Sequence, residues 1–246
     1  MTNRVIEHPA PAPPAAAEEV TGLAADPEAR ARGLAVAAVA KRFGDRTIIQ
    51  DVELGLRPGE AAWISGRNGV GKTTLLRVVA GLIRPDEGTV HLAGFDPRRD
   101  RRAYADRIGF LSAGDRGLYA RLTVTENLQY ATRIAMVPRR GRSAAIDRVT
   151  RLFELDELLP RRADRISMGQ RQRVRLAMTF LHDPLLLLLD EPRNSLDDEG
   201  LALVVAAVQD RLDRGGMTIW CSPKGEPPPF RLAHELVIAD GTLVRA

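Results

Sequence analysis

GRNGVGKT, Gly66–Thr73, matches the pattern G-x-x-x-x-G-K-[ST] at every fixed position. The apolar run AAWIS, Ala61–Ser65, precedes it and predicts a short strand, while the stretch TTLLRVVAGLI that follows predicts a helix. Glycines between a strand and a helix let the backbone curl, so that its N–H groups turn inward and bind anions. This context favours a phosphate-binding loop over a chance glycine-rich turn.

The residues of this loop have different expected roles in holding a triphosphate. Its glycines allow the tight curl, and Lys72 supplies a positive charge for the β- and γ-phosphates. The Thr73 hydroxyl is an expected ligand of Mg²⁺, and Thr74 is expected near the α-phosphate. The predicted nucleotide-binding residues of the loop are Gly66, Arg67, Asn68, Gly69, Val70, Gly71, Lys72, Thr73 and Thr74.

A second segment, LLLLLDEP at Leu185–Pro192, predicts a buried parallel strand that ends in two carboxylates. We expect Asp190 to bind the magnesium shell of a nucleotide. Glu191 is expected to act as general base on a water in line with the γ-phosphate. A surface Asp-Glu pair after a core strand is the alternative, and the phosphate loop upstream favours the catalytic interpretation.

The order of patterns predicts an α/β fold, since strands that alternate with helices build a parallel sheet. From about Thr123 to Leu181 the pattern is helical and Arg-rich, with interruptions at Pro138–Gly141 and Pro160. Residues 1–32 are rich in Ala and Pro and predict a disordered tail. Other expected elements are strands at Leu34–Phe43, Val52–Leu56 and Thr218–Ser222, a returning strand within Asp86–Gly94, a helix at Glu199–Arg214 and a hairpin around Asp240–Gly241.

Length and composition limit the class of protein. The 246 residues suit one domain or a core with a subdomain, and 44% hydrophobic with 28% charged residues is typical of globular proteins. No run of 18 or more apolar residues and no signal-peptide pattern is present, which predicts a cytosolic chain. Cys221 is the only cysteine, so an internal disulfide and a cysteine-based metal cluster are excluded.

Positive charge is concentrated in one part of the chain. Between Pro97 and Arg173 there are 18 Arg, no Lys and 9 acidic residues. Such a region favours nucleic acid or an anionic membrane surface as a partner. The 33 Arg against 3 Lys in the whole chain also fit a GC-rich codon bias. An aromatic content of 4% argues against single-stranded nucleic acid.

The segment ISMGQRQRVRLA, Ile166–Ala177, resembles the signature of the ABC ATPase family, usually written LSGGQ. Ser167, Gly169 and Gln170 match this signature, and Met168 lies within it. NSLD, Asn194–Asp197, resembles the D-loop that follows the catalytic glutamate. Phe43, in KRFG, stands where the family places an aromatic that stacks on adenine, and core packing is the alternative role. The resemblance covers most of the chain from Leu34 to its end.

The resemblance implies a P-loop NTPase core with a mostly parallel sheet, an antiparallel β subdomain and a helical signature subdomain at roughly residues 115–180, within an ATPase domain at 33–246. It implies an ATP-dependent dimer, in which the signature of one subunit covers the γ-phosphate bound by the other, and it implies that Asp197 is the D-loop residue. ATP and Mg²⁺ are the implied cofactors. The implied partners are membrane permease subunits and a second ATPase subunit, and no nucleic acid is expected. The chain is therefore expected at the inner face of the cell membrane, as a peripheral protein.

RGLYARLTVTENL, Arg116–Leu128, resembles the corresponding stretch in bacterial exporters of lipids, polysaccharides or drugs.

Two positions depart from the family pattern. In IGFLSA, Ile108–Ala113, Ala113 stands where the family has a glutamine that binds Mg²⁺ and orients water, and Ser112 and Asp115 are candidate substitutes. In TIWCSPKGE, Pro223 stands where the family has its switch histidine, and Lys224 is a candidate to supply a charge in its place. These changes predict Mg-ATP binding with slow hydrolysis.

Two alternative functions remain open on sequence grounds. The first is a degenerate regulatory partner that binds ATP but barely cleaves it, which Ala113 and Pro223 favour and the intact Glu191 opposes. The second is an ABC-type ATPase that acts on nucleic acid. Only the basic region supports the second, since the chain has a single cassette and no heptad run.

Overall fold

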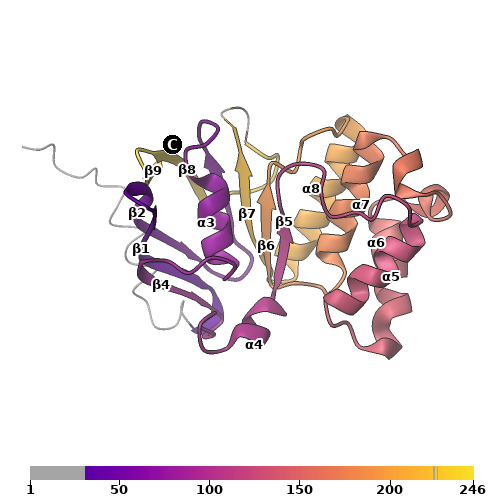
Figure 1. Ribbon diagram of the computed structural model, residues 1–246, viewed down its shortest axis with the longest axis horizontal. Helices are drawn as coiled ribbons and strands as arrows, with labels where there is room; N and C mark the ends of the chain where they lie inside the picture. Colours follow the sequence, from indigo (N-terminus) through magenta and orange to yellow (C-terminus); the bar gives the residue numbers. More distant parts are fainter. Residues whose placement is uncertain (1–30, 224, 226) are drawn as a thin grey trace, which may run out of the picture.

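A computed structural model of the chain describes residues 31–223, 225 and 227–246. The predicted tail, residues 1–32, lies almost entirely outside the described residues. In the described part, two sheets and a group of helices form the fold (Figure 1). The mixed α/β architecture, with a parallel sheet, a separate antiparallel sheet and helices, confirms the predicted fold class. The predicted domain limits stay predictions.

The larger sheet has six strands in the order β5-β6-β7-β3-β8-β9. Neighbouring strands are parallel from β5 to β8, and only β9 runs antiparallel, in a hairpin with β8. The carboxyl ends of parallel strands meet at one edge of such a sheet, where ligands bind in open α/β folds. Its strands are β3 (Ala61–Ser65), β5 (Ile108–Leu111), β6 (Leu186–Asp190), β7 (Met217–Ser222), β8 (His234–Ala239) and β9 (Thr242–Arg245).

The smaller sheet is antiparallel and has the order β2-β1-β4. Its strands are β1 (Leu34–Phe43), β2 (Arg46–Leu56) and β4 (Glu87–Leu92). Phe43 pairs with Arg46 across a two-residue turn, in which Gly44 has a φ of 57°. This sheet lies beside α3 at the indigo end of the molecule in Figure 1.

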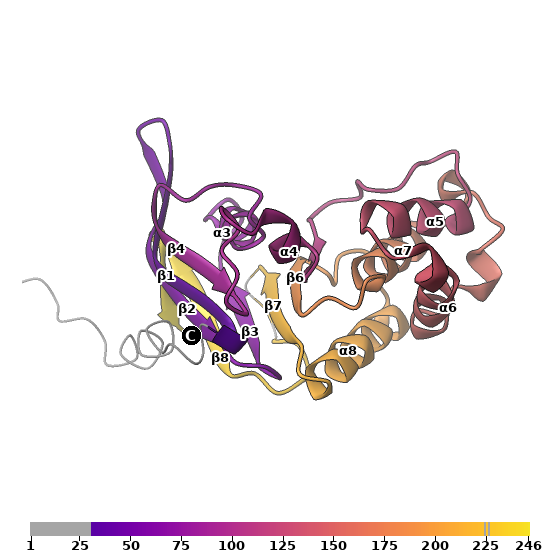
Figure 2. The same cartoon turned by 90° about the horizontal axis from the view of Figure 1, so that it is seen from below.

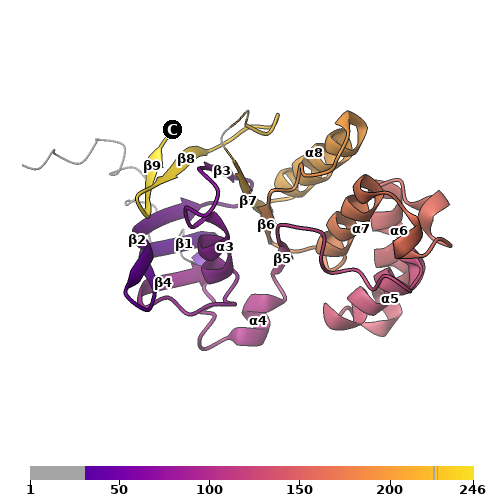
Figure 3. The ribbon, with the colours of Figure 1, turned by 45° about the horizontal axis from the view of Figure 1, so that its top comes forward.

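The helices divide between the two faces of the larger sheet. Helix α3 packs in one hydrophobic core with the smaller sheet, whereas α5 to α8 contribute to a second core on the opposite face. Figures 2 and 3 show α5, α6 and α7 grouped at the end of the molecule away from the smaller sheet. The helices are α3 (Lys72–Val79), α4 (Arg101–Ala105), α5 (Val124–Ile134), α6 (Arg142–Leu152), α7 (Met168–Phe180) and α8 (Asp198–Asp213), with short 3-10 turns at Arg139–Gly141, Asp156–Leu158 and Ala163–Arg165.

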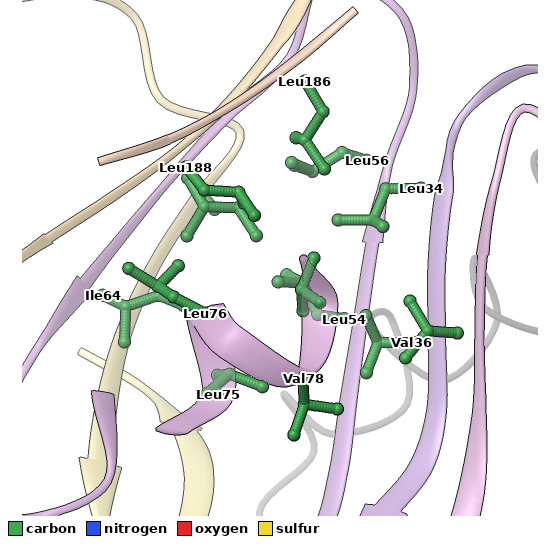
Figure 4. Close-up of a cluster of buried hydrophobic side chains, with 14 of the residues drawn as sticks. Leu34, Val36, Leu54, Leu56, Ile64, Leu75, Leu76, Val78, Leu186 and Leu188 are labelled. Atoms are coloured by element: carbon green, nitrogen blue, oxygen red, sulfur yellow. The ribbon is translucent and has the colours of Figure 1, made fainter. Parts of the chain in front are cut away.

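Strand β6 contains four consecutive leucines, Leu186–Leu189, which are buried on both faces of the sheet. Leu186 and Leu188 point into the core with α3, and Leu187 and Leu189 point into the core with α7 and α8. All four are fully buried, because side chains alternate across a strand and both faces of this one are covered. Figure 4 shows Leu186 and Leu188 among side chains from α3 and the smaller sheet. Each such burial contributes about 1.5–3 kcal/mol.

Three elements differ from the sequence-based prediction. Helix α3 ends at Val79 instead of continuing to Ile83, because Gly81 leaves the helix with a φ of 69° and its N–H bonds to Val78 O. Strand β2 begins at Arg46, six residues before the prediction, since the turn at Gly44 starts the pairing with β1 at once. Helix α4 was not predicted, because five residues are too few for a periodic pattern.

Among the described residues, none of the helices has the length and apolar character required to cross a bilayer.

Candidate nucleotide site

The glycine-rich loop joins β3 to α3, as its sequence predicts. Gly71, the residue before α3, has a φ of 121°, and a Cβ there would lie 3.1 Å from Ile48 O. Only glycine therefore fits this position without strain. The loop leads directly into the first turn of α3, where the N-terminal backbone N–H groups and the helix dipole favour binding of an anion.

Lys72 is the first residue of α3 and is 5% exposed. Its ammonium donates to Gly66 O at 2.7 Å and to Arg67 O at 3.1 Å. These bonds fold the side chain back over its own loop. The charge of Lys72 therefore lies where the backbone curl would hold phosphate oxygens.

Thr73 and Asp190 meet across the edge of the larger sheet. Thr73 Oγ1 donates to Asp190 Oδ2 at 2.6 Å, although the two residues are 117 positions apart in the chain. Asp190 is the last residue of β6 and is 1% exposed. Burial raises the pKa of the Asp190 carboxyl, and Glu191 adds to the increase, while the Thr73 hydrogen bond and Lys72 oppose it.

This pair of oxygens fits a magnesium ion. Asp190 Oδ1 is buried and has no hydrogen bond of ordinary geometry within the described chain, although the nearby Ala113 N–H also favours the ionised carboxylate. No cluster of three or more His, Cys, Asp or Glu side chains suited to a metal occurs among the described residues. Mg²⁺ needs no such cluster, since it is held by one or two protein oxygens together with water and phosphate.

Glu191 is held in place at the end of β6. Its N–H donates to Cys221 O at 2.8 Å, and its Oε2 accepts from Asn194 Nδ2 at 2.6 Å. The backbone of Glu191 has a φ of 53°, a left-handed conformation that a non-glycine residue adopts only when its surroundings impose it. Sequence reasoning assigned no role to Asn194 itself; its position three residues after Glu191 is the only signal for this contact.

A pocket of about 290 Å³ surrounds the phosphate loop. Phe43 lies at this pocket with 52% of its surface exposed, and Lys41 Nζ is 5.4 Å from its ring centroid. An exposed ring at this place offers a flat surface to a base. The predicted site residues that line the pocket are Phe43, Asn68, Gly69, Gly71, Lys72, Thr73, Thr74 and Glu191, whereas Gly66, Arg67 and Val70 do not line it.

Val70 packs instead against the first core, and its N–H bonds to Arg67 O at 3.3 Å. Arg67 is exposed on the outside of the curl. The side chains of these two residues therefore contribute to the shape of the loop and lie outside the pocket.

The signature segment lies at the start of α7. Ser167 caps this helix: its Oγ accepts from Gln170 N at 3.1 Å, and Gln170 Oε1 accepts from Ser167 N at 3.0 Å. Ser167 is exposed, Met168 is 57% exposed, and Gly169 and Gln170 are partly exposed. None of these four residues lines the pocket at the phosphate loop. The segment is therefore accessible at the surface, at the start of α7.

One further segment, Asn194–Asp197, was predicted to take part in the site. Asp197 caps α8, since its Oδ1 accepts from Gly200 N at 2.8 Å. A Cβ on Gly169 would lie 2.7 Å from Ser195 O, so the segment between Glu191 and Asp197 packs directly against the start of α7.

The two departing positions bring no polar side chain to the site. Ala113 follows β5 and offers only its backbone N–H near Asp190. Pro223 is exposed after β7, and Lys224, considered above as a charged substitute, lies outside the described residues. The last residue of β7, Ser222, is occupied by a buried hydrogen bond from Trp63 Nε1 at 2.7 Å.

Residues 49–194 match the family model described as ABC transporter. The chain is 38% identical over 161 residues to the ABC transporter ATP-binding protein NatA of Bacillus subtilis, an alignment that covers 64% of this chain and 65% of the relative. It is 37% identical over 211 residues to the Fe(3+) ions import ATP-binding protein FbpC 2 of Rhodococcus jostii, which covers 83% of this chain and 59% of that protein. The matched part is therefore less than two thirds of the length of either relative.

A solved structure described as the ATP-binding subunit of an ABC transporter has the same fold. Its TM-score is 0.77 at 21% sequence identity, over 86% of this chain and 88% of that one.

Proposed function

This chain belongs to the ABC transporter family of ATP-binding proteins, and from that premise we propose that it binds Mg-ATP at its phosphate loop and hydrolyses it to drive transport. The 2.6 Å contact between Thr73 Oγ1 and the buried Asp190 is the observation that carries the proposal. It joins the phosphate loop to the strand that ends in Asp190, whose Oδ1 has no hydrogen bond of ordinary geometry in the described chain and could bind a cation.

In this proposal the chain's own groups divide between binding and chemistry. Loop N–H groups and Lys72 hold the phosphates, and Phe43 stacks on the base. A magnesium ion bound by Thr73 and Asp190 would neutralise charge on the β- and γ-phosphate oxygens. Glu191 accepts a proton from water as the water oxygen bonds to the γ-phosphorus, and the bond to the β–γ bridging oxygen breaks to leave ADP and phosphate.

The signature segment supports a two-subunit arrangement. Ser167 and Met168 are exposed at the start of a 13-residue helix. Such a helix end attracts anions. Because the segment does not reach the phosphate loop of its own chain, we propose that it covers the γ-phosphate held by a second subunit, with Asp197 near the interface. ATP then holds the two subunits together until hydrolysis.

A groove beside β5 supports a membrane partner. It has a volume of about 370 Å³ and lies between β5, α5 and α7, with apolar side chains that include Phe110, Ile134 and Met178. Ile134 is 64% exposed at its edge. Exposed apolar surface of this kind marks contacts with other proteins. We propose that a segment of a permease subunit docks here and holds the chain at the inner face of the membrane.

The rate and direction of transport are finer proposals. Ala113 and Pro223 support slow hydrolysis, either intrinsic to the chain or typical of a regulatory subunit paired with a faster ATPase. Arg116–Leu128 supports export, by its resemblance to exporters, while the Rhodococcus relative is named for import. Transport assays in vesicles with the permease, using inside-out and right-side-out preparations, measure the direction.

Sedimentation of the Glu191→Gln variant with and without Mg-ATP tests the two-subunit proposal. We expect a monomer alone and a dimer with Mg-ATP, because ATP is bound but not cleaved. Met168→Glu in the same background should abolish the dimer by placing a carboxylate against the partner's phosphate. Leu82→Glu, at an exposed residue in the turn after α3, is the matched control and should leave the dimer intact.

Calorimetry with Mg-ATP tests the site itself. A protein that binds no ATP would refute the nucleotide site, and a dimer that forms without ATP or survives Met168→Glu would refute the sandwich.

A further inference from the structure

Arg175 lies on α7 with only 5% of its surface exposed, yet no acidic side chain bonds to it in the described chain. Its guanidinium donates instead to three backbone carbonyls: Arg116 O at 2.7 Å, Ser112 O at 2.6 Å and Gly114 O. All three belong to residues 112–117, the β5 loop, which connects β5 to the segment before α5. A buried charge is costly unless it is fully hydrogen-bonded, so this arrangement holds both the arginine and the loop.

The β5 loop carries one of the two departures from the family pattern. Ala113 lies between Ser112 and Gly114, the residues whose carbonyls Arg175 binds. Its backbone N–H lies near Asp190 and lowers the pKa of that carboxyl, which favours the ionised carboxylate. Arg175 therefore fixes the loop on both sides of Ala113, whose backbone N–H lies near the carboxylate of Asp190.

A second contact extends the same network toward the general base. Gln172, one turn earlier on α7 and 6% exposed, accepts from Arg175 Nη1 at 2.5 Å through its Oε1. Its Nε2 donates to Pro192 O at 3.2 Å. Pro192 directly follows Glu191, whose φ of 53° shows that its backbone is constrained. The buried path thus runs from the β5 loop through Arg175 and Gln172 to the segment that holds Glu191.

We propose that Arg175 and Gln172 are positioning residues for ATP hydrolysis, which fix the β5 loop and the Glu191–Pro192 segment relative to each other where no glutamine side chain is present to do so. The inference rests on the proposed ATPase function. Neither residue touches the nucleotide pocket, so both act through the backbone of the two segments that they bind.

A purely structural role for Arg175 predicts different behaviour. In that case its loss lowers stability and the amount of folded protein, while the folded fraction keeps its turnover number. A positioning role predicts a lower kcat in fully folded protein with the KM for ATP unchanged, because the phosphate loop lies outside the network. A displacement of about 1 Å in a reacting group costs up to about 100-fold in rate.

The first measurement compares steady-state ATP hydrolysis by Arg175→Met, Arg175→Lys and the control Arg151→Met. Methionine keeps the length of the side chain and removes the donors, and Arg151 is exposed on α6. We expect kcat to fall about 10- to 100-fold in Arg175→Met, to recover partly in Arg175→Lys and to stay at the wild-type level in Arg151→Met, with KM within about twofold in all three. Gln172→Met should lower kcat as well, and the double variant should lose less than the product of the two single losses.

Hydrogen exchange without nucleotide is the second measurement, and it does not depend on activity. Peptides that contain Glu191 and Asn194, whose N–H groups bond to Cys221 O and Glu191 O, should exchange faster in Arg175→Met than in wild type or Arg151→Met. Unchanged exchange there, or a lower melting temperature with wild-type kcat, would overturn the inference. If the wild-type protein neither binds nor cleaves ATP, the proposed function fails, and the exchange result still decides the positioning role.

Discussion

The phosphate loop and the loops that follow β5 and β7 meet at one edge of the same sheet, but they differ in what they bring to it. The phosphate loop contributes backbone N–H groups, Lys72 and Thr73, all within eight consecutive residues. The loops after β5 and β7 contribute Ala113 and Pro223, neither of which has a polar side chain. The phosphate loop therefore has every fixed residue of its motif, while the loops after β5 and β7 lack the polar side chains that the family has at these two positions.

Binding and hydrolysis thus depend on different kinds of structure. Binding is built from local backbone geometry, which the glycines and the start of α3 secure together. Hydrolysis depends on side chains that several distant strands deliver to one point. Glu191, the proposed base, is present and accepts a hydrogen bond from Asn194 at 2.6 Å, while Ala113 and Pro223 replace two polar residues of the family pattern.

Substitution of Glu191 is expected to cause the largest change in the rate of ATP hydrolysis. Glu191→Gln keeps an oxygen for the Asn194 contact but removes the proton acceptor, so hydrolysis should fall about 100- to 10,000-fold while ATP affinity stays within about twofold. Single-turnover hydrolysis and calorimetry measure the two quantities. Glu199→Gln, on the exposed first turn of α8, is the control. Unchanged hydrolysis in Glu191→Gln would show that another residue is the base, and would contradict the assignment of hydrolysis to the end of β6.

A smaller loss is expected on the binding side. Lys72→Ala removes a charge-assisted contact to the phosphates worth about 1.5–3 kcal/mol, so ATP affinity should fall about 10- to 100-fold. Calorimetry measures the dissociation constant, and Arg77→Ala, exposed on the same helix, should bind as wild type does. If both variants bind ATP equally well, the phosphate loop does not grip the nucleotide.

Restoring the missing groups should sharpen the contrast. Pro223→His and Ala113→Gln, singly and together, should raise kcat by up to about tenfold without changing ATP affinity. This gain is below the 100-fold or more that a fully positioned donor contributes, because a newly introduced side chain is less precisely oriented than one that its surroundings hold in place. Steady-state hydrolysis measures it. A rise in affinity with no change in kcat would contradict the division between binding and hydrolysis.

The smallest expected effect is at Phe43. Its ring is about half exposed, so Phe43→Ala should weaken ATP binding by about fivefold, corresponding to about 1 kcal/mol of stacking. Comparison of ATP with inorganic triphosphate separates the base from the phosphates: the variant should lose affinity only for ATP. Tyr130→Ala, on α5, is the control. Equal losses for both ligands would mean that Phe43 shapes the loop instead of stacking on the base.

Much of the fold was predictable because its signals are local. The strand Leu34–Phe43, the strand Ala61–Ser65 and the buried leucines of β6 follow from short apolar patterns and were found as expected. The end of α3 and the start of β2 were wrong, since single glycines at 81 and 44 decide both boundaries through positive φ values. Helix α4 was missed because it is held by contacts with distant residues, such as the hydrogen bond from Tyr104 Oη to Val79 O, which a local sequence pattern does not predict.

The phosphate loop, the acidic end of β6 and the segment at the start of α7 could be identified without the structure. Each consists of consecutive residues whose chemistry does not depend on distant parts of the chain. Only the tertiary structure decided that Thr73 meets Asp190, that Asn194 holds Glu191 and that Arg175 binds the loop around Ala113. These contacts join residues that separate strands and helices carry. They exist only once the sheet has been assembled and both of its faces have been covered.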